Sequence, residues 1–263
     1  MPLDLAITQA GDDQAGTPLV ILHGLFGAKK NWGSLQKQFA RTRPVIAADL
    51  RNHGESPWDD AMDYEAMADD IAHVIESHLG GTPANVVGHS MGGKASMMLA
   101  LRRPELVARL CVVDIAPAPN ASGGLTDFVE AMRDLDLSKA DRRGDVDAML
   151  KQQVPDPGVR AFLLTNLTAG DKGLSWQPNL DVLSAQMPAI EGFPDTDDAS
   201  PYEGPCLFIA GAKSDYIGPQ HQAEIERLFP QAEIESIDGA GHWVHAEQPK
   251  AFMQAVEKFL EKS

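Results

Sequence analysis

The sequence predicts an α/β fold: a mostly parallel central sheet, flanked by helices and interrupted by a helical insertion. Short apolar runs alternate with helical patterns along most of the 263 residues, as in sheets built from strands and crossover helices. One apolar run leads into a Gly-x-Ser-x-Gly motif and then into a helical pattern. A stretch with no convincing strand, residues 117–205, separates two of the expected strands.

The expected elements follow from the period of the apolar residues. Residues 64–78 place their apolar side chains on one helical face, and so do residues 252–260, which follow Pro249 at a favourable first-turn position. The expected strands, in chain order, are Leu5–Thr8, Pro18–Leu22, Val45–Ala48, Ala84–Val87, Arg109–Val113, Cys206–Ala210 and Glu233–Ser236.

Residues 117–205 interrupt this alternation with several helical stretches, and proline and glycine punctuate both ends. We therefore expect a core of residues 1–116 and 206–263 and a helical cap of residues 117–205. Ligands of open α/β folds bind beyond the carboxyl ends of the strands, where this insertion would lie, so a lid is favoured over a purely structural excursion. The expected cap helices are Leu125–Leu135, Asp141–Gln153, Gly158–Leu167 and Leu180–Ile190.

Composition excludes several classes of function. The formal net charge of −16 argues against binding to nucleic acid or to anionic membranes. The chain has no apolar stretch long enough to span a bilayer and shows no signal-peptide pattern at its start. Cys111 and Cys206 each lie in an apolar run, which favours buried thiols in a reducing compartment over a disulfide. The prediction is a cytoplasmic protein.

The strongest motif is the run from Gly88 to Gly93, Gly-His-Ser-Met-Gly-Gly. Between a strand and a helix, this pattern is typical of a nucleophile elbow, in which a tight turn exposes the serine at the carboxyl edge of the sheet. The glycines are expected because side chains two residues before and after the serine would collide with neighbouring backbone. Ser90 is therefore the candidate nucleophile.

His242 is the candidate base among eight histidines. It lies in a glycine-rich loop between the last strand and the last helix, and a chain order of serine first and histidine last suits this architecture. His89 adjoins the serine but is expected to point away from it, and His23 is expected to brace its own loop. His245 is three residues beyond His242, but nothing nearby completes a metal site, so no metal is predicted.

Two carboxylates could orient the histidine. Asp215 follows the Cys206–Ala210 strand, but in the common Gly-x-x-Asp spacing the acid would fall on Ser214. Asp114 closes the preceding strand, at the edge adjacent to the nucleophile and beside the start of the insertion. We favour Asp114, and Asp215 remains the alternative.

An oxyanion hole requires two backbone N–H groups. Met91 follows the nucleophile, and Leu25 lies in the glycine loop after the Pro18–Leu22 strand, with Phe26 as the next candidate. Aromatic and apolar side chains near the cap are candidates for an acyl pocket, among which Phe26 and Trp176 are the predicted substrate-binding residues; the others are Phe128, Met132, Phe162, Leu163 and Met187.

Together these motifs resemble the α/β-hydrolase superfamily over nearly the whole chain, and more narrowly the small esterases of the YbfF type and of abhydrolase domain-containing protein 11. The resemblance implies carboxylesterase or thioesterase activity, a helical cap and no cofactor. It also favours Asp114, because members of this group typically lack an aspartate in the turn that contains Asp215. The motifs that carry the resemblance are His23–Gly27, Asp49–Ser56, Gly88–Gly93, Val112–Pro117, Ser214–Tyr216 and Gly241–Trp243.

The predicted function is therefore a serine esterase acting on short- to medium-chain acyl esters. Serine at position 90 argues against dehalogenases and epoxide hydrolases, which use a carboxylate nucleophile. A cofactor-free perhydrolase or haloperoxidase, or a carbon–carbon bond hydrolase, could use the same three residues. A non-catalytic ligand-binding protein is the alternative from another class. The sequence predicts neither the individual substrate nor the oligomeric state.

Overall fold

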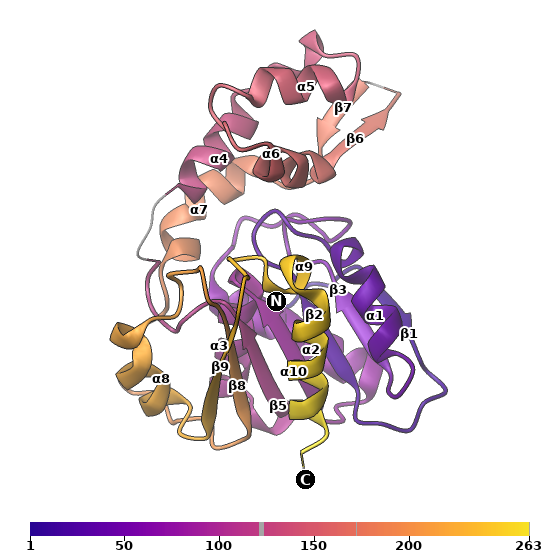
Figure 1. Ribbon diagram of the computed structural model, residues 1–263. Helices are drawn as coiled ribbons and strands as arrows, with labels where there is room; N and C mark the ends of the chain where they lie inside the picture. The colour runs from indigo at the N-terminus through magenta and orange to yellow at the C-terminus, as the bar shows by residue number, and fades with distance from the viewer. Residues whose placement is uncertain (121–123, 172, 263) are drawn as a thin grey trace.

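The computed structural model describes residues 1–120, 124–171 and 173–262, and its centre is a seven-stranded sheet of order β1-β3-β2-β4-β5-β8-β9. All neighbouring strands are parallel except β1, which pairs antiparallel with β3 (Figure 1). The predicted mostly parallel sheet is thus confirmed. The strands are β1 Ile7–Ala10, β2 Leu19–Leu22, β3 Val45–Ala48, β4 Ala84–His89, β5 Val107–Val113, β8 Cys206–Gly211 and β9 Ala232–Ile237.

Helices cover both faces of this sheet. On one face, α2 (Tyr64–Leu79), α3 (Met91–Arg102) and α8 (Gln222–Leu228) bury their apolar sides against the sheet. On the other face, α1 (Gly33–Phe39) and α10 (Pro249–Leu260) do the same. Because both faces are covered, strands β2, β3, β4 and β8 are buried at every position, as is typical of central strands in a parallel sheet.

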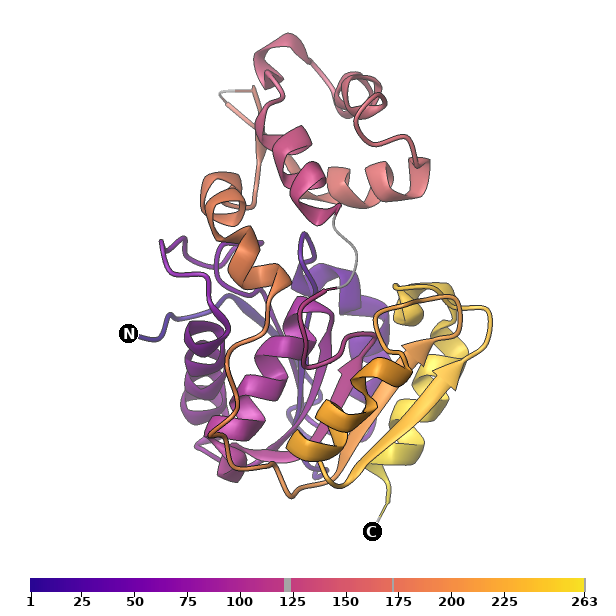
Figure 2. The ribbon, with the colours of Figure 1, turned by 90° about the vertical axis from the view of Figure 1, so that its left-hand side faces the viewer.

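Within the segment between β5 and β8, residues 117–205 are hereafter called the insertion. Most of the insertion lies beyond one end of the sheet in Figures 1 and 2, whereas residues 192–205 run back along the side of the sheet to the start of β8. The insertion contains an antiparallel pair of short strands, so the expectation of no strand in this region is wrong. Each strand has only four residues, too few to give a clear alternating pattern, and the first begins where the sequence predicted the end of a helix. The elements are α4 Leu125–Arg133, α5 Arg143–Leu150, α6 Pro157–Leu163, β6 Leu167–Gly170, β7 Gly173–Trp176 and α7 Leu180–Glu191.

A buried lysine joins both ends of the insertion to the helix that follows Ser90. Lys94 lies in α3 and is 1% exposed. Its Nζ atom donates hydrogen bonds to Asn120 Oδ1 (2.9 Å), Glu191 O (3.0 Å) and Gly192 O (2.6 Å). Burial lowers the pKa of Lys94 to about 7, although the nearby Glu191 carboxylate acts in the opposite direction. Lys94 therefore connects the chain entering the insertion to the chain leaving it.

Because of Lys94, the free energy of unfolding should depend on pH at pH values above 7. The pKa of Lys94 falls from 10.5 in the unfolded chain to about 7 in the folded protein. Between these values the unfolded chain binds more protons, so the free energy of unfolding rises with pH. Relative to Lys94→Met, the free energy of unfolding of the wild type should rise between pH 7 and pH 9, approaching about 1.4 kcal/mol per pH unit. Urea unfolding of both proteins at several pH values measures this difference, and a flat or falling difference would contradict the assignment.

Candidate active site

Ser90 lies on a strained turn between β4 and α3. Its backbone has φ 52° and ψ −119°, and its N–H donates to Val113 O at 3.0 Å, which fixes the turn against the end of β5. A Cβ atom at Gly88 would lie 2.3 Å from Gly92 O, and one at Gly92 would lie 2.5 Å from His23 O. The glycines on either side of Ser90 are thus required by close backbone approach.

Asp114 and His242 form a hydrogen-bonded pair at the same edge of the sheet. Asp114 directly follows β5, is fully buried, and accepts a hydrogen bond from His242 Nδ1 at 2.8 Å through Oδ2. Its other oxygen, Oδ1, accepts from Gly211 N–H at 2.8 Å, and Ser214 Oγ donates to Oδ2 at 2.5 Å. The carboxylate is therefore held by groups from the β8 turn, and it fixes the orientation of the His242 ring.

Asp215, the alternative acid, is placed differently. Its side chain is exposed, and the His242 Nδ1 hydrogen bond goes to Asp114. The neighbouring Ser214, at the Gly-x-x-Asp position, donates its hydroxyl to Asp114 instead. The Tyr216 ring stacks on the His242 ring, with 4.1 Å between the ring centroids and an interplanar angle of 26°.

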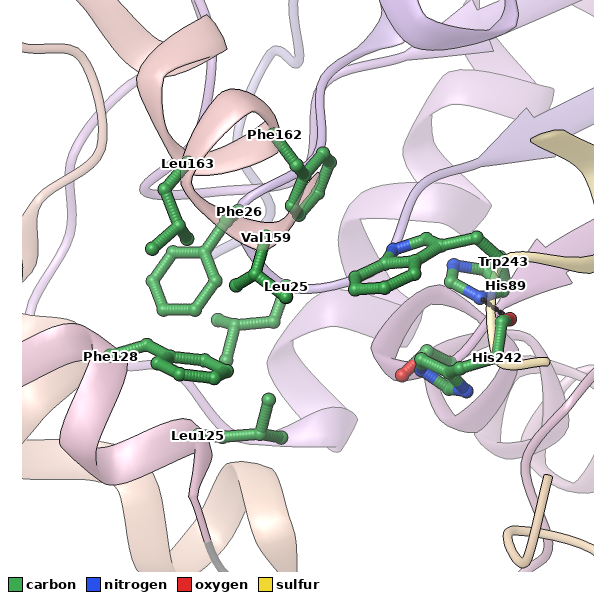
Figure 3. A pocket seen from close by; sticks show the side chains of 11 residues that line it. Leu25, Phe26, His89, Leu125, Phe128, Val159, Phe162, Leu163, His242 and Trp243 are labelled. Atoms are coloured by element: carbon green, nitrogen blue, oxygen red, sulfur yellow. Dashed lines mark hydrogen bonds between the residues drawn. The ribbon is translucent and has the colours of Figure 1, made fainter. Parts of the chain in front are cut away.

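Ser90 and His242 both line one small cavity of about 40 Å³, shown in Figure 3. Of the predicted pocket residues, Phe26, Phe128, Phe162 and Leu163 line it, from both the core and the insertion. The others lie elsewhere: Met132 and Met187 are buried in the core cluster, and Trp176 packs against that cluster from β7 with its Nε1 atom buried. The lining residues absent from the expectation are Leu125, Val159, His89 and Trp243, and the Leu25 side chain joins them.

His89 lies closer to the site than expected. Its side chain is 4% exposed, and its ring centroid is 4.7 Å from that of His242. The Nε2 atom hydrogen-bonds to His242 O at 2.9 Å, the contact marked by the dashed line in Figure 3. Because a carbonyl oxygen only accepts, Nε2 carries the proton and donates. Burial lowers the pKa of His89 well below its usual range, so the ring stays neutral. His89 therefore supports the backbone of the loop that carries His242.

The loop after β2 contains the Leu25 amide, a candidate oxyanion donor. Phe26 N–H donates to His53 Nε2 at 3.2 Å, whereas the Leu25 amide donates to no other residue within the described ranges. His23 braces this loop as expected: Leu50 N–H donates to Nε2 at 2.9 Å, so Nδ1 carries the proton and donates to Gly24 O at 2.8 Å. Met91 is the first residue of α3, so its amide has no acceptor within the helix.

Three further observations concern metal sites, membrane spans and cysteines. Over the part of the chain that the structure describes, no group of three or more histidine, cysteine, aspartate or glutamate side chains could hold a metal ion. No helix there is both long enough and apolar enough to cross a membrane. Cys111 and Cys206, on the adjacent strands β5 and β8, are both buried free thiols.

Comparisons with known proteins identify the family of the chain. A family model described as alpha/beta hydrolase fold matches residues 17–249. A Mus musculus protein named sn-1-specific diacylglycerol lipase ABHD11 is 42% identical over 266 residues, which cover 98% of this chain and 86% of that protein. Esterase YbfF of Escherichia coli (strain K12) is 35% identical over 260 residues, or 99% of each chain.

A solved structure supports the same relationship. The structure titled Marine microorganism esterase matches with a TM-score of 0.92 at 35% sequence identity, covering 98% of this chain and 99% of the other. The family model spans most of the sheet, both flanking layers and the insertion. The chain is therefore an enzyme of the α/β-hydrolase fold family.

Proposed function

We propose that this protein is a serine carboxylesterase that works through an acyl-enzyme intermediate. The observation that carries the proposal is the Asp114–His242 hydrogen bond together with the strained Ser90 turn, because His242 and Ser90 line the same apolar cavity. Esterase and lipase names among relatives at 35–42% identity support the same class of reaction. The roles follow from the chemistry of the three side chains and of two free amides.

In the first step, His242 Nε2 takes the proton of Ser90 as Oγ attacks the ester carbonyl. Asp114 holds the proton on Nδ1, which leaves Nε2 free to act as base and stabilises the cationic ring that forms. The amides of Leu25 and Met91 donate to the oxyanion. His242 then protonates the leaving alcohol, and water activated by the same ring releases the acid from Ser90.

The cavity supports a preference for short acyl groups. Its volume of about 40 Å³ has room for a few atoms, and its walls are mainly aliphatic and aromatic. Medium-length chains would require the insertion to move away from the core. This supports a lid role for the insertion, because Leu125, Phe128 and Phe162 contribute walls from α4 and α6.

A panel of p-nitrophenyl esters from acetyl to dodecanoyl tests the proposal. We expect the highest kcat/KM with acetyl to butyryl esters, and a decline with longer chains as the cavity is exceeded. A thioester and a diacylglycerol in the same panel test the activities suggested by the resemblance and by the name of the mouse relative. If a correctly folded protein hydrolyses none of these compounds, it is not a general esterase, and a ligand-binding role gains support.

A further inference from the structure

Phe26 adopts a backbone conformation that the chain must hold in place. Its φ is 60°, in the left-handed region, and it is not a glycine. Such a conformation is strained for a bulky residue, and it persists only where the surroundings fix it. Phe26 directly follows Leu25, so fixing the backbone of Phe26 restricts the path of the loop that carries the Leu25 amide. The groups that hold Phe26 are therefore important for the proposed oxyanion hole.

Two side chains hold the backbone of Phe26: one binds its N–H and the other binds its carbonyl oxygen. Its N–H donates to His53 Nε2 at 3.2 Å, and its carbonyl accepts from Asn166 Nδ2 at 2.8 Å. His53 is fully buried, and its Nδ1 donates to Arg51 O at 3.0 Å. Burial lowers the pKa of His53 to about 3, so the ring stays neutral and Nε2 remains an acceptor.

Asn166 comes from the insertion, not from the core. It lies at the end of a short 3-10 turn, Leu164–Asn166, that follows α6, and its side chain is completely buried. Its amide nitrogen also donates to Leu163 O at 3.2 Å. Both partners are carbonyl oxygens, which can only accept, so the orientation of the amide group is determined. Its Oδ1 atom is buried without a partner in the described structure, which leaves the donor side as the reason for an asparagine here.

We propose that Asn166 is a positioning residue for the oxyanion hole. It acts through the Phe26 carbonyl, holds the left-handed backbone of Phe26 and thereby fixes the loop from which the Leu25 amide donates to the oxyanion. This inference rests on the proposed serine esterase activity. Phe162 and Leu163, which line the cavity, belong to the same short stretch of chain as Asn166. The insertion therefore shapes the pocket wall and also sets one oxyanion donor.

The test replaces Asn166 by aspartate, which has the same shape but presents an oxygen to the Phe26 carbonyl instead of an N–H. We expect kcat on p-nitrophenyl acetate to fall by about 10- to 100-fold with KM almost unchanged, because only transition-state stabilisation is lost. Inhibition by a phenylboronic acid, which forms a tetrahedral adduct on the serine, should weaken by a similar factor. Asn166→Ala should give the same pattern and covers the case in which the aspartate variant does not fold.

Asn120→Asp is the matched control. Asn120 also lies in the insertion, and its Oδ1 accepts from Lys94 Nζ at 2.9 Å, a role that a carboxylate retains. This variant should keep the kcat of the wild type. If both Asn166 variants fold and keep kcat and boronate affinity within about twofold of this control, the positioning role is wrong. If the wild type itself hydrolyses no ester and does not bind the boronate, the proposed function fails instead.

Discussion

Replacing Ser90 by alanine is expected to lower kcat on p-nitrophenyl acetate by at least about 10⁴-fold, because Ser90 carries the only hydroxyl among the described residues that line the cavity. The fold should survive, since alanine and serine have similar steric requirements at a φ of 52°. Circular dichroism and thermal unfolding measure the fold, and initial rates measure the activity. Ser77→Ala, at an exposed position on α2, is the control and should match the wild type. Substantial activity in a folded Ser90→Ala protein would contradict the assignment of the nucleophile.

Replacing Asp114 by asparagine should lower kcat by about 10³- to 10⁴-fold. The asparagine amide would donate to His242 Nδ1, which forces the proton onto Nε2 and removes the base that Ser90 needs. Asp215→Asn is the matched control, because the same change is made to an exposed carboxylate a short distance along the β8 turn. Initial rates for both variants across a range of pH values measure the effect. A large loss in Asp215→Asn, with activity kept in Asp114→Asn, would identify Asp215 as the acid.

Much of the core was predictable from sequence because local patterns determine it. Strand β3 has the predicted bounds, and the glycines around Ser90 report a turn in which no larger residue fits. The choice between Asp114 and Asp215 was harder, because both follow strands that end at the same edge of the sheet. Only the three-dimensional structure gives the 2.8 Å contact from Asp114 to His242.

The features missed from sequence depend on contacts between distant segments. His89 was expected to point away from Ser90, yet it reaches the backbone of His242, far along the chain. Trp176 has the size and polarity of a pocket residue, but β7 carries it away from the cavity wall. Asn166 has no motif at all, and its importance follows only from the carbonyl that it contacts. Sequence periodicity reports burial, and it does not report which buried neighbour a side chain meets.

The most direct test of the central claim is covalent labelling of the nucleophile. The protein is incubated with a fluorophosphonate, and the intact mass and the modified peptide are then determined by mass spectrometry. We predict one adduct per chain, located on Ser90, absent from Ser90→Ala and retained in Asp215→Asn. Labelling of a different residue, or no labelling of the folded wild-type protein, would contradict a serine hydrolase mechanism at this site.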